Sequence, residues 1–383
     1  MPHVKRTIAL PSMTPGTRRR LAFHRFGKAG ARPKAYLQAA IHANEFPGAM
    51  ALHHLMPMLV EADRRGRIKG EIVVVPTVNP IGLSQLVGNR HLGRYEFLGR
   101  DNFNRSWHDL SGIVAEQVGA SLGPNAAENV AAIRAEARAA LAAMKPVNEL
   151  QTLRVEVMKL AVDADVVLDL HCDAEAVLHL FISRQDWPGP ARVLAADIGA
   201  AATLYNEPYP ESLTFSGVNS ALWARLAERF PAANIPQACL SATVEYRGEH
   251  DVNHKLGDAD ARNLYRFLVR RGIISGRAGK LPRPRTDATP IGGMDVGYCP
   301  KAGLLVYHLP KGSKVRKGMP VCEVIDLSNA RGPRARTQIV ARTDGILFSR
   351  KRDGRLAWPG MVVFRIAGAR LLAHRKGMSG LDD

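Results

Sequence analysis

Two short stretches, AAIHANEFPGAM (Ala39–Met50) and ADVVLDLH (Ala164–His171), decide how this chain is organised. Each begins with apolar residues typical of a buried strand and then presents polar side chains, His42 and Glu45 in the first stretch and His171 at the end of the second. In open α/β sheets, groups at the carboxyl ends of the strands meet at one edge. The two stretches therefore predict an α/β fold that brings these three side chains together.

The runs around these stretches extend the same pattern. A helix is expected from about Pro47 to Ala62, with its proline in the first turn, where the missing N–H is not needed. The resulting β-α-β order is typical of a doubly wound mixed sheet. Two or three helices are expected in the Ala- and Glu-rich segment 109–163. Buried strands are expected at Ala35–Ile41, Glu71–Val75, Val166–Leu170, Val177–Ile182 and Ala238–Glu245.

The C-terminal part has a different composition. A Pro- and Arg-rich linker at 280–290 is followed by short apolar runs punctuated by glycine, and GLLV at 303–306 recurs as GILF at 345–348. Such a repeat predicts a small pseudo-symmetric β-barrel of the biotinyl/lipoyl kind. No lysine lies between Lys317 and Lys351, so a swinging-arm carrier is excluded. The predicted division is a catalytic domain at 1–285, a β-barrel domain at 286–370 and a tail at 371–383.

Composition narrows the class of protein. The chain has 383 residues, with 53 Lys+Arg against 35 Asp+Glu for a net charge of +18, but only 6% aromatic residues. The basic residues are spread along the chain without interleaved aromatics, so we expect no nucleic-acid partner. No run resembles a signal peptide or a membrane span, and the four cysteines form no CxxC pair. We therefore expect a cytoplasmic protein with reduced thiols and no membrane partner; the oligomeric state stays open, and a homo-oligomer is compatible with the sequence.

Two imidazoles and one carboxylate are a characteristic ligand set for a catalytic metal. His42, Glu45 and His171 would leave one coordination position of a zinc ion open, which a hydrolytic site needs and a structural site lacks. We expect one Zn²⁺ per chain. Asp169 stands two residues before His171 and is a candidate to orient that imidazole.

Glu245, in SATVEYRGEHD (Ser241–Asp251), is the candidate general base. It ends an apolar strand, which should bring it to the same sheet edge as the ligands. A base is needed there to take a proton from the attacking water and to return it to the leaving group. Glu249, four residues later, is the second candidate.

RDNFNRSW (Arg100–Trp107) supplies candidate substrate-binding groups. Asn104 and Arg105 would hold a substrate carboxylate, since a guanidinium binds carboxylates through two parallel hydrogen bonds. Arg100 or Arg94 would stabilise the oxyanion, and the sequence does not decide between the two.

The remaining histidines are weaker candidates. His53 and His54 are adjacent in the first long helix and cannot both face one metal ion. His250 and His254 have ligand-like spacing, but they lie in a polar stretch that is typical of a loop opening a helix.

Taken together, these motifs resemble the succinylglutamate desuccinylase/aspartoacylase family, a branch of the zinc carboxypeptidase-like hydrolases. The resemblance rests on HANE, FNR, DLH, TVEYRG and the Gly-rich C-terminal repeat, and it covers nearly the whole chain. It implies zinc on His42, Glu45 and His171, Glu245 as general base, Asn104 and Arg105 as the carboxylate clamp, and Arg100 as oxyanion partner.

The chain also departs from the family pattern. Asn102 stands where an aspartate is usual, and Cys172-Asp173-Ala174-Glu175 follows the third ligand in place of the common Thr- or Asn-bearing continuations. The sequence thus predicts a zinc-dependent deacylase that hydrolyses the amide bond of a small anionic N-acyl amino acid or a similar carboxylated amide. A zinc carboxypeptidase acting on short peptides, and a non-enzymatic basic binding protein, are the alternatives.

Overall fold

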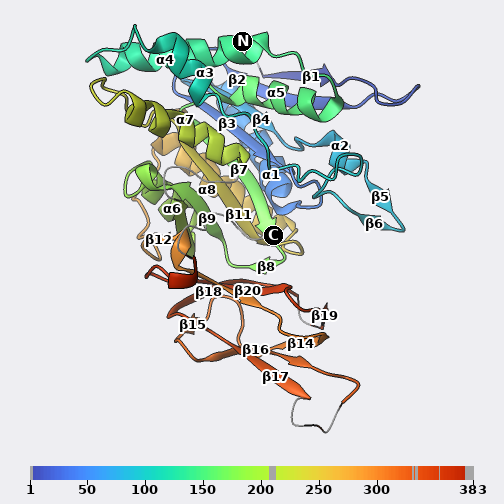
Figure 1. The fold of residues 1–383 in the computed structure, drawn as a ribbon. Helices are drawn as coiled ribbons and strands as arrows, with labels where there is room; N and C mark the ends of the chain where they lie inside the picture. Colours follow the sequence, from blue (N-terminus) through green and yellow to red (C-terminus); the bar gives the residue numbers. More distant parts are fainter. Residues whose placement is uncertain (1–2, 207–212, 330–331, 333–334, 353, 376–383) are drawn as a thin grey trace.

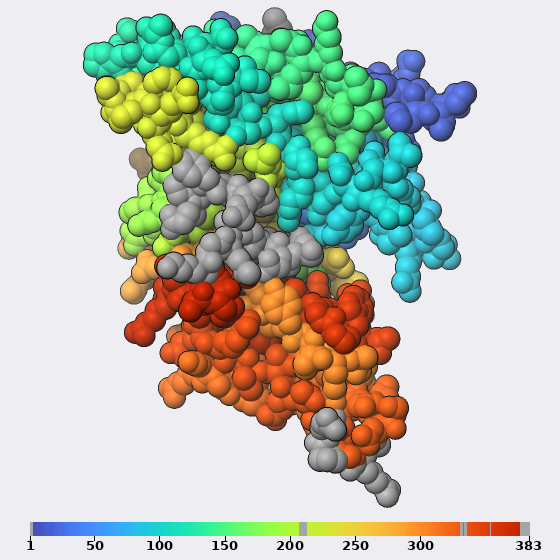
Figure 2. All heavy atoms as spheres, in the orientation of Figure 1, coloured from blue at the N-terminus to red at the C-terminus, as the bar shows by residue number. Residues whose placement is uncertain are grey.

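The computed structural model describes residues 3–206, 213–329, 332, 335–352 and 354–375. A large α/β part carries most of the helices, and a smaller, all-β C-terminal unit lies against it (Figure 1). Drawn as filled volumes, the C-terminal unit forms one end of the molecule, coloured orange to red (Figure 2).

A mixed nine-stranded sheet is the centre of the large part. Its four middle strands, β4, β3, β7 and β11, run parallel to one another, whereas β1 and β2 at one end and β9 beside β11 introduce antiparallel pairs. The predicted α/β fold with a mixed sheet is confirmed. In spatial order the strands are β1 (Val4–Ala9), β2 (Arg20–Gly27), β4 (Glu71–Val75), β3 (Lys34–Ala39), β7 (Val166–Asp173), β11 (Leu240–Gly248), β9 (His179–Ser183), β10 (Ala202–Asn206) and β12 (Thr289–Pro290).

Helices cover both faces of this sheet, because alternate strand residues point to opposite sides and both sides are apolar. One face packs against α1 (Pro47–Arg64), α6 (Pro190–Ile198) and α8 (His254–Arg270). The other packs against α3 (Ser111–Val118), α4 (Ala126–Ala143), α5 (Glu149–Ala161) and α7 (Phe215–Arg229). Smaller elements are α2 (Pro80–Leu83), β5 (Leu86–Val87), β6 (Arg90–His91), β8 (Glu175–Ala176) and the 3-10 turns η1 (Arg184–Asp186), η2 (Ile291–Gly293) and η3 (Ala373–Arg375).

The Ala- and Glu-rich segment forms three helices, α3, α4 and α5, at the end of the molecule away from the C-terminal unit (Figure 1). Asparagine side chains cap two of them: Asn125 accepts from the first backbone N–H groups of α4, and Asn148 accepts from Gln151 N of α5. Such caps satisfy backbone donors that have no partner within the helix.

The C-terminal repeat is visible in the structure as four strands that recur 42 residues later. The first copy has β13 (Met294–Tyr298), β14 (Gly303–Tyr307), β15 (Lys314–Val315) and β16 (Pro320–Ile325), and the second has β17 (Arg336–Val340), β18 (Gly345–Arg350), β19 (Leu356–Ala357) and β20 (Val362–Ala367). The recurrence of GLLV as GILF had indicated the β14/β18 correspondence; β13 and β17 had not been predicted.

Strand pairing follows the same repeat. Leu304 pairs with Ile325, as Ile346 pairs with Ala367. The short strands cross over, since β15 pairs with β18 of the other copy and β19 pairs with β14. The result is two sheets, β13-β20-β18-β15 and β17-β16-β14-β19, packed on one apolar core, in place of one continuous barrel sheet.

The C-terminal unit is joined to the large part by more than the chain. β12 extends the nine-stranded sheet, and β8 of the large part pairs with β18. Asp173, at the end of β7, accepts from Arg365 Nη1 at 3.2 Å and from the Ser349 hydroxyl. The C-terminal unit is therefore anchored directly below the strand that carries His171.

Two further features concern the described residues. No helix there is long and apolar enough to cross a membrane. All four cysteines are buried, and none of them forms a disulfide.

Candidate active site

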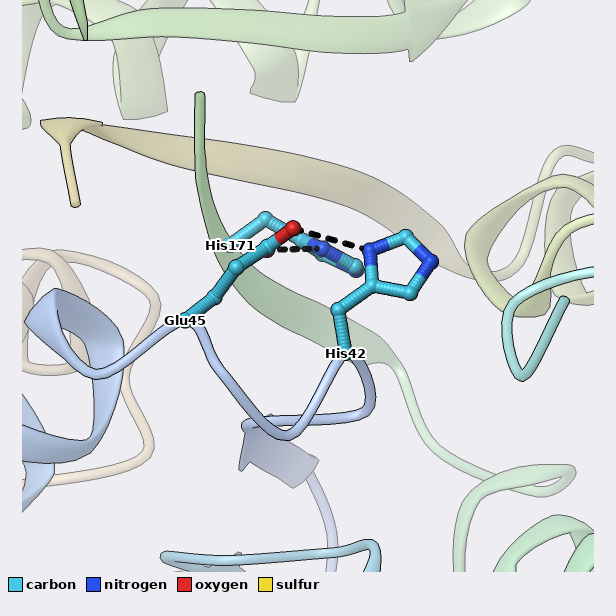
Figure 3. A group of neighbouring side chains, drawn as sticks. All are labelled: His42, Glu45 and His171. Carbon is cyan, nitrogen blue, oxygen red and sulfur yellow. Dashed lines mark hydrogen bonds and ion pairs between the residues drawn. The ribbon is translucent and has the colours of Figure 1, made fainter. Parts of the chain in front are cut away.

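The three expected metal ligands form a compact cluster at the carboxyl ends of adjacent strands β3 and β7 (Figure 3). The Glu45 carboxylate lies between two imidazoles: Oε1 is 2.9 Å from His42 Nδ1, and Oε2 is 2.8 Å from His171 Nδ1. One donor atom from each residue lies within 4.8 Å of the others, and all three residues are buried. The structure thus brings together the three residues that the sequence singled out.

The ligand loop between β3 and α1 is shaped by backbone constraints. Ala40 takes a left-handed conformation (φ 59°), which turns the chain sharply after β3, and Glu45 N donates to His42 O at 3.0 Å. Gly48, in the first turn of α1, allows that helix to approach β7; a Cβ there would lie 2.6 Å from Leu170 Cβ. The loop is therefore pressed against the strand that carries His171.

Hydrogen bonds fix the ring orientation of His42. Asn102 Oδ1 accepts from the backbone N–H of Asn104 at 2.9 Å, which identifies it as the amide oxygen. The same oxygen lies 2.8 Å from His42 Nε2, so Nε2 must donate to it. The lone pair of His42 Nδ1 then faces Glu45, as a metal ligand requires.

His171 has an analogous support of different chemistry. Its Nε2 donates to Asp169 Oδ2 at 2.9 Å. Asp169 also accepts from Gln38 Nε2 at 2.9 Å and from Asn104 Nδ2 at 3.3 Å. The proposed orienting role of Asp169 matches this geometry. Two donor nitrogens and a carboxylate converge on one point, a set that suits a divalent ion such as zinc.

Electrostatics keep the cluster's carboxylate ionised. Burial alone would raise the pKa of Glu45, but the imidazoles of His42 and His171 hold it well below its ordinary value. Burial alone would lower the pKa of His171, but the carboxylates of Asp169 and Glu45 outweigh this effect and raise the pKa well above 6.5. For His42, burial prevails and lowers the pKa.

Glu245 lies beside the cluster, on β11, where it is the register partner of His171. Burial, reinforced by the nearby charges of Glu45 and Asp173, raises the pKa of this carboxyl to about 8. Its Oε2 is buried and has no hydrogen-bond partner among the described residues. A carboxyl in this state can accept and release a proton near neutral pH.

A cavity of about 360 Å³ opens from the cluster. Arg94 lies at the ligands, with Nη1 3.2 Å from Glu45 Oε1 and 3.3 Å from His42 Nδ1. Gly93 makes this possible, because a Cβ there would lie 2.5 Å from Asn44 N of the ligand loop. Arg100 is exposed and is not among the residues that line the cavity. Of the two oxyanion candidates, the structure thus places only Arg94 at the ligands.

The two residues of the expected carboxylate clamp differ in their surroundings. Both line the cavity, and Arg105 Nη1 donates to Asn104 O at 2.9 Å. Both polar atoms of the Asn104 amide are hydrogen-bonded within the protein: Oδ1 accepts from Phe215 N at 2.9 Å, and Nδ2 donates to Asp169. Asn104 therefore supports the ligand His171, and Arg105 is the member of the pair with charge to offer a substrate.

The remaining candidates are distributed as follows. Glu249 lines the cavity, and burial raises the pKa of its carboxyl. His54 and His254 lie against each other on α1 and α8, 3.1 Å between Nε2 and Nδ1, and neither lines the cavity. His53 and His250 do not line it either.

Sequence reasoning had missed part of the cavity wall. Lys351 and Arg365 of the C-terminal unit line it, together with a group of serine and threonine side chains. Asn102 had been noted only as a departure from a pattern, not as the partner of His42. Its position three residues before Arg105 could have marked Asn102 as a site residue. Its contact with His42, however, depends on how two loops fold against each other.

A comparison with protein families agrees with this geometry. The model of the succinylglutamate desuccinylase/aspartoacylase catalytic domain matches residues 31–227, more than half of the chain. The chain belongs to this family. The match contains the three ligand residues, Asn104 and Arg105, and it ends before β11, the strand of Glu245. A search of curated proteins found no match.

Solved structures share the fold across the full length. A family protein from Shewanella amazonensis superposes with a TM-score of 0.83 at 22% identity, covering 95% of this chain and 98% of its own. A succinylglutamate desuccinylase/aspartoacylase from Shewanella frigidimarina gives 0.82 at 19% identity, with 96% and 97% covered. The ectoine utilization protein EutE of Ruegeria pomeroyi gives 0.66 at 17% identity, with 96% and 95% covered. At these identities the likeness establishes the fold, including the C-terminal part, and not the substrate.

Proposed function

We propose that this family hydrolase is a zinc-dependent deacylase, which hydrolyses the amide bond of a small, anionic N-acyl amino acid or a similar carboxylated amide. The observation that carries the proposal is the convergence of one donor atom each from His42, Glu45 and His171 within 4.8 Å, beside a buried carboxyl at Glu245. One ion per chain would be held by these three residues. When bound, zinc lowers the pKa of a coordinated water to about 7 and polarises a carbonyl.

Glu245 would act as the general base and then as the general acid. In its ionised form, Glu245 would take a proton from the attacking water and deliver it to the amide nitrogen as the C–N bond breaks; its raised pKa makes it a stronger base than an exposed carboxylate. The products are a carboxylate and an amine. Its position opposite His171 in the β7–β11 register holds this carboxyl next to the ligands without making it one.

Two arginines would bind the substrate. Arg94, next to Glu45 and His42, would stabilise the negative charge that develops on the carbonyl oxygen. Arg105 would hold the substrate carboxylate through its guanidinium fork. The net charge of +18 would add a salt-sensitive attraction for anionic substrates.

The C-terminal unit favours small substrates over peptides. Ile291, Lys351 and Arg365 line the cavity, so the residues of this unit close one side of it. We propose that the unit is a biotinyl/lipoyl-like sandwich that serves as a wall of the site and not as a carrier. A carboxypeptidase working on short peptides would need that side open.

The test is a screen of zinc-loaded protein for amine release. The panel contains N-acetyl, N-formyl and N-succinyl amino acids and a set of short peptides. We expect release from at least one N-acyl amino acid, and less release from peptides that share its C-terminal residue. Glu245→Gln should keep zinc and lose roughly two orders of magnitude or more in turnover. Peptide cleavage without deacylation would establish the carboxypeptidase alternative, and full turnover in Glu245→Gln but none in Glu249→Gln would reassign the base.

A further inference from the structure

One wall of the cavity is polar where the fold would normally be apolar. On β11, Ser241, Thr243 and Glu245 alternate toward the cavity, whereas Ala242 and Val244 on the opposite face join the core under α1 and α8. Strand residues advance about 3.3 Å each, so the row reaches about 13 Å from Glu245 to Ser241. The cavity therefore extends along β11 from Glu245 to Ser241, between the sheet and α7.

Other hydroxyl groups complete this extension. Ser216 and Ser220 lie in the first turns of α7, and Ser183 lies at the end of β9 beside β11. We call the five residues Ser183, Ser216, Ser220, Ser241 and Thr243 the hydroxyl arm. Deeper residues of α7, such as Leu222 and Trp223, pack into the apolar core as expected for a helix on a sheet. The polar lining is thus confined to the part of α7 that borders the cavity.

The hydrogen-bonding capacity of the arm is only partly used by the protein. Ser216 Oγ and Thr243 Oγ1 bond to each other at 2.7 Å, and Gln237 Nε2 donates to Ser220 Oγ at 3.0 Å. Ser241 is 2% exposed, and its hydroxyl has no partner among the described residues; the same holds for Asn206 Oδ1 at the cavity wall. Buried polar atoms without partners are unfavourable, so a site that contains them is suited to a ligand that bonds to them.

The arm carries no charge of its own. Apart from Glu245, the described residues of β9, β11 and α7 that line the cavity are uncharged, and the lining cations Arg94, Arg105, Lys351 and Arg365 come from other segments. Asp186 lies near Ser220, but burial raises the pKa of its carboxyl to about 8, which keeps it largely neutral at pH 7. The arm residues themselves therefore offer neither a cation nor an anion to a substrate side chain.

The start of α7 connects the arm to the substrate carboxylate. Asn104 Oδ1 accepts from Phe215 N, the first residue of α7, and Arg105 follows Asn104 directly. Arg105 and Ser216 line the same cavity, so a carboxylate held by Arg105 would share that cavity with the entrance of the arm. The side chain on the same carbon atom as that carboxylate is the part of the substrate that can enter.

We propose that the hydroxyl arm selects N-acyl amino acids whose side chain is neutral and both donates and accepts hydrogen bonds, that is, a hydroxyl- or carboxamide-bearing chain. The proposal rests on the proposed deacylase function and names the amine half of its substrate. Sites built to bond a substrate hydroxyl discriminate strongly against the analogue that lacks it, because their own polar groups are then left without partners.

The experiment compares near-isosteric pairs with the acyl group that the screen identifies. We expect kcat/KM for the N-acyl derivatives of homoserine and glutamine to exceed that for norvaline and glutamate by at least about tenfold. Preference for norvaline, or for glutamate, would overturn the proposal while leaving the deacylase function intact. No hydrolysis of any derivative would instead count against the function. Calorimetry with free homoserine and free norvaline on zinc-loaded protein decides the preference in that case too, since tighter binding of norvaline would also overturn it.

Two arm variants and one matched control locate the effect. Thr243→Val and Ser241→Ala should each reduce the homoserine-to-norvaline ratio several-fold, mainly through KM. Thr203→Val removes a hydroxyl that is also buried and has no hydrogen-bond partner in the described part of the chain, but that does not line the cavity, so the ratio should stay unchanged. An unchanged ratio in both arm variants, or an equal change in Thr203→Val, would contradict the assignment.

Discussion

The imidazoles of His42 and His171, the two histidines of the proposed metal site, are held in different ways. His171 lies within a strand, and its Nε2 donates to the Asp169 carboxylate, which is fully buried. His42 lies on a loop, and its Nε2 donates to the neutral amide oxygen of Asn102. A carboxylate partner makes an imidazole a stronger base than an amide partner does. The opposite pKa shifts of the two histidines, raised for His171 and lowered for His42, agree with this difference.

The difference shows how ligand strength is distributed across the site. His171, with its anionic partner, should bind a metal ion more strongly than His42. His42, with its neutral partner and lowered pKa, loses its proton more easily before it binds a metal ion. A site with one charged support holds less negative charge than a site with two. Three predictions test whether this asymmetry matters for metal binding.

The largest effect is expected for Asp169→Asn. This change keeps the size of the side chain but gives His171 the same kind of partner as His42. Zinc affinity, measured by competition with a chromophoric chelator, should fall about 10- to 100-fold. Circular dichroism of the metal-free variant serves as the folding control, because Asp169 also accepts from Gln38 and Asn104. Unchanged affinity in a folded variant would show that the carboxylate is not important.

A pH series gives the next largest effect. Because the pKa of His171 is raised in the folded metal-free protein, its proton stabilises the fold fully below pH 6.5, and this contribution is lost as pH rises through the folded pKa. Zinc must displace that proton, so its affinity should rise by about tenfold per pH unit in this range.

Two scans check the sign. The Tm of the metal-free protein should decrease as pH rises above 6.5, whereas the Tm increase caused by zinc should grow. In Asp169→Asn both slopes should flatten, since the main group that raises the pKa of His171 is gone. An increase in the metal-free Tm over this range would contradict the assigned proton.

The smallest effects are expected at Asn102. Asn102→Leu removes the acceptor for His42 Nε2 and for the Asn104 N–H, and zinc affinity should fall about tenfold. Asn102→Asp makes the two supports alike, and affinity should rise a few-fold. Equal affinities in wild type and both variants would mean that the loop holds His42 without help from its Nε2 partner.

How much of this could be read from the sequence depends on how local each feature is. His42 and Glu45 are three residues apart on one loop, and His171 follows an apolar strand, so strand position alone brought them together. Glu245 was found by the same argument. The C-terminal repeat was visible in the spacing of Gly303 and Gly345. Each begins a strand at a close backbone approach, where a Cβ would lie 2.4 Å from Ile325 O in the first copy and 2.2 Å from Ala367 O in the second.

Other features depend on long-range packing. Arg94 and Arg100 look equivalent in the sequence, and only the contact of Gly93 with the ligand loop places Arg94 at the cluster. The hydroxyl arm draws its residues from β9, β11 and α7, and no local pattern marks Ser183 and Ser220 as neighbours. The same applies to Asn102, whose role depends on two loops meeting.

The most direct test of the central claim is the zinc content of purified protein. We measure it for wild type, for the His42→Ala, His171→Ala double variant and for Glu245→Gln, each checked for folding by circular dichroism. Wild type and Glu245→Gln should bind about one zinc per chain, and the double variant should bind almost none. Full zinc occupancy in a folded double variant would show that the ion lies elsewhere and would contradict the account of the site.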